Sequence, residues 1–261
     1  MKTVRMEEMT APQIRRAINS GYKTVIVSAG SIEQHGKHLP IGTDAMASSI
    51  LAERVARELG DALAAPIIRP GCSDHHMDFA GSLSVSESLL QEICWAYCRC
   101  LEHHGFERIA LMSTHGGNNR AMSEVAPKID AEMDARVVWI RREEDQKLSE
   151  QAVAILEKYG VTSEEGGAHA GFIETSFLLA TDYAQLVDME SAERGWIGNS
   201  AQKIAEVSDD DGHWNIAHIS PIGTLGDPRK SSREAGEKLL ELGVKRVTEM
   251  VREALAERPA P

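Results

Sequence analysis

The chain contains 261 residues, of which 42% are hydrophobic and 26% are charged, a composition close to that of an average soluble globular protein. Its 40 acidic residues outnumber its 28 basic residues, so the formal net charge is −12, which argues against a nucleic-acid partner because phosphate backbones require a basic surface. No apolar run reaches the roughly 18 residues of a membrane span, and the first residues lack the apolar core of a signal peptide. We therefore expect a cytoplasmic protein without a membrane segment.

Short apolar runs alternate with segments of helical periodicity along the chain. Strands are expected at residues 23–29, 65–69, 108–113 and 136–140, and helices at about 44–59, 86–104, 119–133, 149–159, 172–181 and 230–256. This alternation is typical of βαβ units. It predicts an α/β fold in which helices cover both faces of a mainly parallel sheet, and we expect one domain over residues 1–261.

Residues 185–228 do not follow this alternation. The segment is rich in Gly, Asp and Ser and shows little periodicity. We expect either a long surface loop or an oligomer contact there.

The four cysteines are not expected to form disulfides. Three of them, Cys94, Cys98 and Cys100, lie on one expected helix, and with Cys72 they do not resemble the disulfide framework of a secreted protein. Cys94 and Cys98 would share a helix face and could hold a metal. We expect instead that these cysteines are small apolar side chains in the core, because free cysteines are usually buried.

Potential metal ligands follow the first expected strand. Glu33 and His35 are separated by one residue, so in an extended segment both side chains project to the same side. Asp44 opens the next expected helix, where it could cap backbone N–H groups or bridge two cations. Carboxylates and imidazoles suit Zn²⁺ or Mn²⁺, and sites in open α/β sheets form at the carboxyl ends of strands.

The same residue types recur at two later element ends. His115 follows the third expected strand and precedes Gly116 and Gly117, whose small size lets a ligand approach the backbone. His169 precedes an expected helix that carries Glu174 in its first turns. We interpret this recurrence as one composite metal site rather than as separate surface histidines.

Five glycine-containing motifs occur in the following order: Gly30-Ser31-Ile32-Glu33-Gln34-His35-Gly36, Gly42-Thr43-Asp44, Phe79-Ala80-Gly81-Ser82-Leu83-Ser84, His115-Gly116-Gly117-Asn118 and His169-Ala170-Gly171-Phe172-Ile173-Glu174-Thr175-Ser176. As an ordered set they are specific, and the chain resembles the creatininase (creatinine amidohydrolase) family over nearly its whole length. The resemblance implies a three-layer α/β/α sandwich, two divalent metal ions (Zn²⁺ and/or Mn²⁺, with Fe possible) and often a homohexamer.

The resemblance also implies residue roles. Glu33, His35, Asp44 and His115 match metal ligands of the family, with Asp44 bridging the two ions. His169 matches the histidine proposed there as a catalytic acid or base.

One metal-ligand position departs from the family pattern. Creatininase has a glutamate ligand two residues after the histidine that matches His115, and this chain has Gly117 there. The second metal would then lack a ligand, so we assign this role to Glu174 on the grounds of chemical need.

A second departure concerns the substrate. Creatininase encloses creatinine with tryptophans in the segment before the catalytic histidine, whereas this chain has no Trp between Ile140 and His169 and carries the charged run Arg141–Asp145 instead. Creatinine is therefore a doubtful substrate. The resemblance also extends to formamide hydrolases that act on pyrimidine nucleotide intermediates, and a polar, hydroxylated or anionic small molecule fits the charged run better.

The expected activity is hydrolysis of a cyclic amide or a formamide. Two cations bridged by Asp44 would lower the pKa of a shared water, which would attack the substrate carbonyl, and His169 would pass a proton to the leaving group. Backbone N–H groups of Gly116 and Gly117 could support the oxyanion. His76, in a loop after a strand, is a candidate substrate contact.

Two alternatives stay open. One is a hydrolase that opens the ring of an oxidised inositol, of the 3-dehydro-scyllo-inosose type, by C–C cleavage with the same metals. The other is a non-catalytic, metal-holding scaffold whose site has decayed, for which Gly117 is the supporting feature. About two bound cations per chain would favour an enzyme over the scaffold. Release of an amine would distinguish amide hydrolysis from C–C cleavage of the inositol.

Overall fold

A four-stranded parallel sheet lies at the centre of the protein, in the strand order β2-β1-β3-β4. The structure, a computed structural model, describes residues 2–210 and 212–256. The strands are β1 (Thr24–Ala29), β2 (Ala62–Ala64), β3 (Arg108–Ser113) and β4 (Arg136–Trp139). β1 pairs with β3 along its whole length, so the segments that leave the carboxyl ends of these two strands start at the same edge of the sheet.

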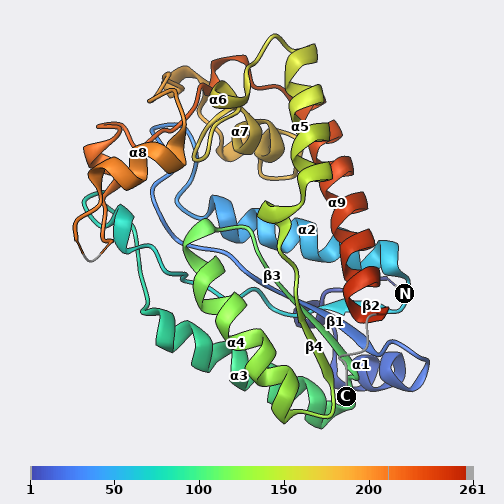
Figure 1. Cartoon of the computed structure of the whole chain (residues 1–261). Coiled ribbons are helices and arrows are strands. Elements are labelled where there is room, and N and C mark those ends of the chain that lie inside the picture. The colour runs from blue at the N-terminus through green and yellow to red at the C-terminus, as the bar shows by residue number, and fades with distance from the viewer. Residues whose placement is uncertain (1, 211, 257–261) are drawn as a thin grey trace.

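Helices cover both faces of this sheet. They are α1 (Ala11–Asn19), α2 (Thr43–Leu59), α3 (Glu87–His104), α4 (Asn119–Glu132), α5 (Gln146–Lys158), α6 (Ser163–Gly166), α7 (Phe172–Leu179), α8 (Ser200–Val207) and α9 (Arg233–Ala256). Figure 1 shows α3 and α4 on one side of the strands and α2 and α9 on the other, and α7 packs against α9. The predicted α/β fold with a parallel sheet between two helical layers is confirmed.

The central strands are mostly apolar, because both of their faces are covered. Every residue of β1 is buried, and so is every residue of β3 after Arg108. Parallel strands between two helical layers have this continuous apolar character. Cys72, Cys94 and Cys98 are free thiols buried in the same core, as expected, while Cys100 is exposed.

The prediction of a strand at residues 65–69 is wrong, because β2 lies earlier, at Ala62–Ala64. Pro66 has no backbone N–H and cannot donate to the ladder. The chain nevertheless stays beside β1, since the N–H of Ile68 donates to the carbonyl oxygen of Ser28 at 3.0 Å. The proline therefore ends the strand without moving the chain away from the sheet.

Helix α1 was not expected from the periodicity. Its start has a capping box, in which the side chain of Thr10 and that of Gln13 each pair with the backbone of the other residue, and Pro12 follows in the first turn. These residues are the sequence signal for a helix start. Among the described residues, no helix combines the length and the apolar character needed to cross a bilayer.

Residues 185–228 are more than a loose surface loop. They contain α8 and several short 3₁₀ helices, and Ile216, Ile219 and Leu225 are buried in a small apolar cluster of their own. The backbone N–H of Trp196 donates to the carbonyl oxygen of Thr224 at 3.0 Å. The expected oligomer contact in this segment stays a prediction.

Candidate metal centre

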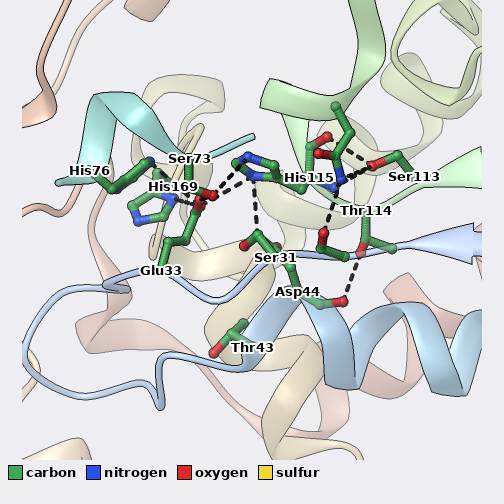
Figure 2. Close-up of polar contacts among 12 residues, drawn as sticks. Ser31, Glu33, Thr43, Asp44, Ser73, His76, Ser113, Thr114, His115 and His169 are labelled. Atoms are coloured by element: carbon green, nitrogen blue, oxygen red, sulfur yellow. Dashed lines mark hydrogen bonds and ion pairs between the residues drawn. The ribbon is translucent and has the colours of Figure 1, made fainter. Parts of the chain in front are cut away.

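The acidic and imidazole side chains meet at the carboxyl edge of β1 and β3. Glu33 and His35 lie in the loop that follows β1, Asp44 is the second residue of α2, and His115 follows β3. Figure 2 shows Glu33 and Asp44 beside His115. Oδ1 of Asp44 lies 3.5 Å from Nε2 of His35, and its Oδ2 lies 3.3 Å from Nδ1 of His115. Asp44 therefore stands between the two imidazoles, in the position that a bridging carboxylate would need.

Glu174 and Glu33 extend this arrangement on its two sides. Oε2 of Glu174 lies 3.9 Å from Nε2 of His35, and Oε1 of Glu33 lies 3.2 Å from Nδ1 of His115. The ligand atoms of His35, Asp44 and Glu174 all lie within 4.8 Å of one another. The structure thus brings together all five residues that the sequence singled out as metal ligands.

The backbone contacts of His35 and His115 leave one ring nitrogen of each histidine facing Asp44. Nδ1 of His35 lies 3.1 Å from the carbonyl oxygen of Glu33, and Nε2 of His115 lies 2.9 Å from that of Cys72. These nitrogens must carry the hydrogens, since a carbonyl oxygen can only accept. Nε2 of His35 is buried and has no hydrogen-bond partner among the described residues. A buried nitrogen without a partner is costly, and a cation would satisfy it, as backbone-oriented histidine ligands do elsewhere.

Serine hydroxyls orient the two buried carboxylates. Oγ of Ser31 donates to Oδ2 of Asp44, and Oγ of Ser73 donates to Oε2 of Glu33, both at 2.6 Å. Oε1 of Glu33 stays directed toward His115, whereas Oδ2 of Asp44 faces both Ser31 and His115 and its Oδ1 faces His35. Neither serine was predicted, and only the place of Ser31 in the motif with Glu33 gave a hint.

Without cations, the imidazoles hold the protons that balance the carboxylates. Burial by itself would lower the pKa of His35, but the neighbouring Asp44 raises it to about 10. Burial would likewise raise the pKa of Glu33, but protonated His115 outweighs it and lowers that pKa to about 2. The pKa of Glu174 is raised to about 7, chiefly by burial. The negative charge of the site therefore attracts positive charge, and the donor set fits Zn²⁺ or Mn²⁺.

Metal binding is expected to strengthen as the pH rises. At neutral pH His35 carries a proton because its pKa is about 10, and a cation must displace this proton in order to bind. The apparent affinity should increase about tenfold per pH unit for each proton released. Calorimetric titration of the metal-free protein with Zn²⁺ in buffers of different ionisation enthalpy measures this release. Binding at pH 7 that releases no proton would contradict the prediction.

His169 lies beside the carboxylate cluster, on the same side as Glu33. Its Nε2 donates to the carbonyl oxygen of Gln34 at 2.7 Å, so its Nδ1 carries no hydrogen and lies 3.7 Å from Oε1 of Glu33. Burial, followed by the charge of His35, lowers the pKa of His169 to about 3. The neutral ring thus presents a proton-accepting nitrogen toward the site.

His76 is held between Gln34 and Glu33. The amide of Gln34 donates to Nδ1 of His76 at 2.9 Å, and the same side chain accepts from the N–H of Gly36 at 2.9 Å, which fixes its orientation. Nε2 of His76 therefore carries the hydrogen, and it lies 3.5 Å from Oε1 of Glu33. Gln34 was not predicted as a site residue, although it stands between two predicted ligands in the sequence.

A cavity of about 890 Å³ leads to the cluster. Glu33, His115 and His169 reach into it from the sheet side, and Gly116, Gly117 and His76 also line it, where a substrate contact was expected. Trp214 and Leu225, from the segment that follows α8, form part of another wall. Glu33 and His115 are buried, and the charged residues Asp74, Glu87 and Arg120 also line the cavity.

The fold and the site together define an α/β protein with a buried carboxylate and imidazole centre at the carboxyl ends of its strands. The family model described as creatinine amidohydrolase matches residues 7–251. The chain belongs to the creatininase family.

Sequence relatives and a solved structure agree with this family. The chain is 30% identical over 230 residues to the mycofactocin precursor peptide peptidase of Mycobacterium ulcerans, covering 84% of this chain and 81% of that protein. It is 25% identical over 270 residues to the creatinine amidohydrolase of Pseudomonas putida, covering 97% of each. A solved structure described as creatininase Mn has the same fold, with a TM-score of 0.80, 24% identity and coverage of 98% of this chain and 100% of that chain.

Proposed function

We propose that this protein is a binuclear metal-dependent hydrolase that cleaves an amide C–N bond. The observation that carries the proposal is the position of Asp44, whose two oxygens face Nε2 of His35 and Nδ1 of His115. His35, Asp44 and Glu174 would hold one ion, and Glu33, Asp44 and His115 would hold the other. Zn²⁺ or Mn²⁺ fits these ligands, and Fe is a further candidate.

The residues around the ions supply orientation and proton transfer. When bound, the pair of cations would polarise the substrate carbonyl and activate water for attack near neutral pH. His169 accepts the proton at Nδ1 and returns it to the leaving nitrogen, while its Nε2 stays anchored to the carbonyl oxygen of Gln34. The N–H groups of Gly116 and Gly117, at the cavity wall, support the developing oxyanion.

We propose a peptide amide as the substrate in preference to creatinine. The cavity of about 890 Å³ lies toward the upper end of the range for small-molecule pockets, and it exceeds what a single small ring requires. The relative from M. ulcerans carries the name of a peptide peptidase. The two arginines of the charged run Arg141–Asp145 contact other parts of the protein. Arg141 pairs with Glu144, and Nη1 of Arg142 donates to the carbonyl oxygen of Ser113 at 2.8 Å.

Substrate screening tests this function directly. Metal-loaded protein is incubated with a panel of peptides, creatinine, formamido-pyrimidines and oxidised inositols, and mass spectrometry with amine detection follows the products. We expect metal-dependent release of one amine and one carboxylate per turnover from a peptide, and no release in the presence of a chelator. Ring opening of an oxidised inositol without release of an amine would contradict amide hydrolysis and favour the C–C hydrolase.

The cellular setting is proposed on the sequence, and the assembly on the family resemblance. We place the enzyme in the cytoplasm and expect a homohexamer, with neither nucleic acid nor membrane as a partner. Gel filtration with light scattering measures the assembly.

A further inference from the structure

Gly117 has no room for a side chain. A Cβ atom at this position would lie 2.1 Å from the carbonyl oxygen of Cys72 and 2.4 Å from Nε2 of His115. It would also lie 3.1 Å from Cε1 of His75. The packing around residue 117 therefore leaves no space for a carboxylate side chain. The imidazole of His75 borders the same space.

His75 offers a nitrogen to the same part of the site. Its ligand atom and those of Glu33 and His115 all lie within 4.8 Å of one another. Side chains that share one ion at about 2.0–2.2 Å place their ligand atoms roughly 3–4.4 Å apart. The spacing of these three groups is close to that range.

Neighbouring rings hold His75 in place. Its ring is nearly parallel to that of His115, at an interplanar angle of 4° and a centroid distance of 5.7 Å. Trp214 contacts it at a centroid distance of 4.6 Å, and His76 at 4.3 Å. An imidazole confined by three rings loses little further freedom when it binds an ion.

The other two histidines near Glu33 are committed to different contacts. Nε2 of His76 carries a hydrogen, because Nδ1 accepts from Gln34, and so it meets Glu33 as a donor. His169 is anchored to the carbonyl oxygen of Gln34 and belongs to proton transfer in the proposed reaction. His75 is thus the neighbouring imidazole whose placement suits a ligand role.

We propose that His75 is a further ligand of the metal ion held by Glu33, Asp44 and His115, while Glu174 takes the role that Gly117 cannot fill at the other ion. This assignment rests on the proposed binuclear centre. It gives the first of these ions a neutral nitrogen ligand in addition to its carboxylates.

Metal titration tests the assignment without any substrate. The parent protein, His75→Ala and the control His103→Ala, which alters an exposed histidine at the end of α3, are stripped of metal and titrated with Co²⁺ and Zn²⁺. Calorimetry measures the affinity and stoichiometry, and the visible absorption of Co²⁺ reports its coordination. We expect one of the two ions to bind at least about 10²-fold more weakly to His75→Ala, with a changed Co²⁺ spectrum, while His103→Ala matches the parent.

Two other results are informative. Unchanged affinity and an unchanged Co²⁺ spectrum in His75→Ala would overturn the role of His75 and leave the binuclear centre intact. A parent protein that binds fewer than two ions would overturn the proposed centre itself. Circular dichroism of the metal-free proteins shows whether His75→Ala is folded, and His75→Gln repeats the test with a side chain of similar size if it is not.

Discussion

Asp44→Asn is expected to remove both metal ions and to reduce turnover by about 10³-fold. Asp44 is buried, and its two oxygens face different imidazoles at 3.5 and 3.3 Å. Asparagine keeps the shape but loses the charge, and one of its two terminal groups becomes a donor that cannot bind a cation. Metal catalysis contributes several kcal/mol, and each 1.36 kcal/mol is about tenfold in rate.

Metal analysis and steady-state kinetics check this expectation. The matched control is Asp182→Asn, because Asp182 is exposed and lies outside the predicted site. It should keep about two ions per chain and the parental rate. An Asp44→Asn protein that retains both ions would show that this residue does not bridge them.

His169→Gln is expected to lower kcat by about 10²–10⁴-fold while both metal ions stay bound. Glutamine can still donate to the carbonyl oxygen of Gln34 through its amide nitrogen, but it cannot accept and return a proton at the position of Nδ1. The defect should therefore lie in kcat rather than in metal content.

The same His169→Gln protein is compared with His103→Gln, whose imidazole is exposed at the end of α3. Metal content by mass spectrometry and kinetics on an amide substrate separate the two effects. Loss of one ion from His169→Gln would mean that His169 is a ligand, as its proximity to Glu33 and His35 permits. A fully active variant would remove His169 from the proposed chemistry.

The layers of the fold could be predicted because buried segments are recognisable from the pattern of apolar residues in the local sequence. β1 and β3 are covered on both faces and are mostly apolar. α3 is bounded by Ser86, whose hydroxyl accepts from the N–H of Leu89, and by Gly105 in a left-handed conformation. β2 could not be placed in this way, since its three residues are too few to show a pattern and Pro66 interrupts the pairing that follows. That residues 1–261 form one domain stays a prediction.

The site was predicted most directly where the ligands follow strands. Glu33, His35 and His115 leave the carboxyl ends of β1 and β3, where α/β sites are expected. Glu174 depends on tertiary packing, since its helix α7 lies against α9 and α2 and no local pattern shows which way it faces. Ser73 is recognisable only through its contact with Glu33, because single serines are common in loops.

The backbone of His169 is fastened to Leu225 in both directions. The N–H of Leu225 donates to the carbonyl oxygen of His169 at 2.8 Å, and the N–H of His169 donates to that of Leu225 at 3.3 Å. Leu225 also lines the cavity, so any shift of this wall carries the imidazole with it. In the proposed reaction, substrate range and rate would therefore be linked, and we expect that remodelling this wall to admit a bulkier molecule displaces the proposed general base unless these two hydrogen bonds are preserved.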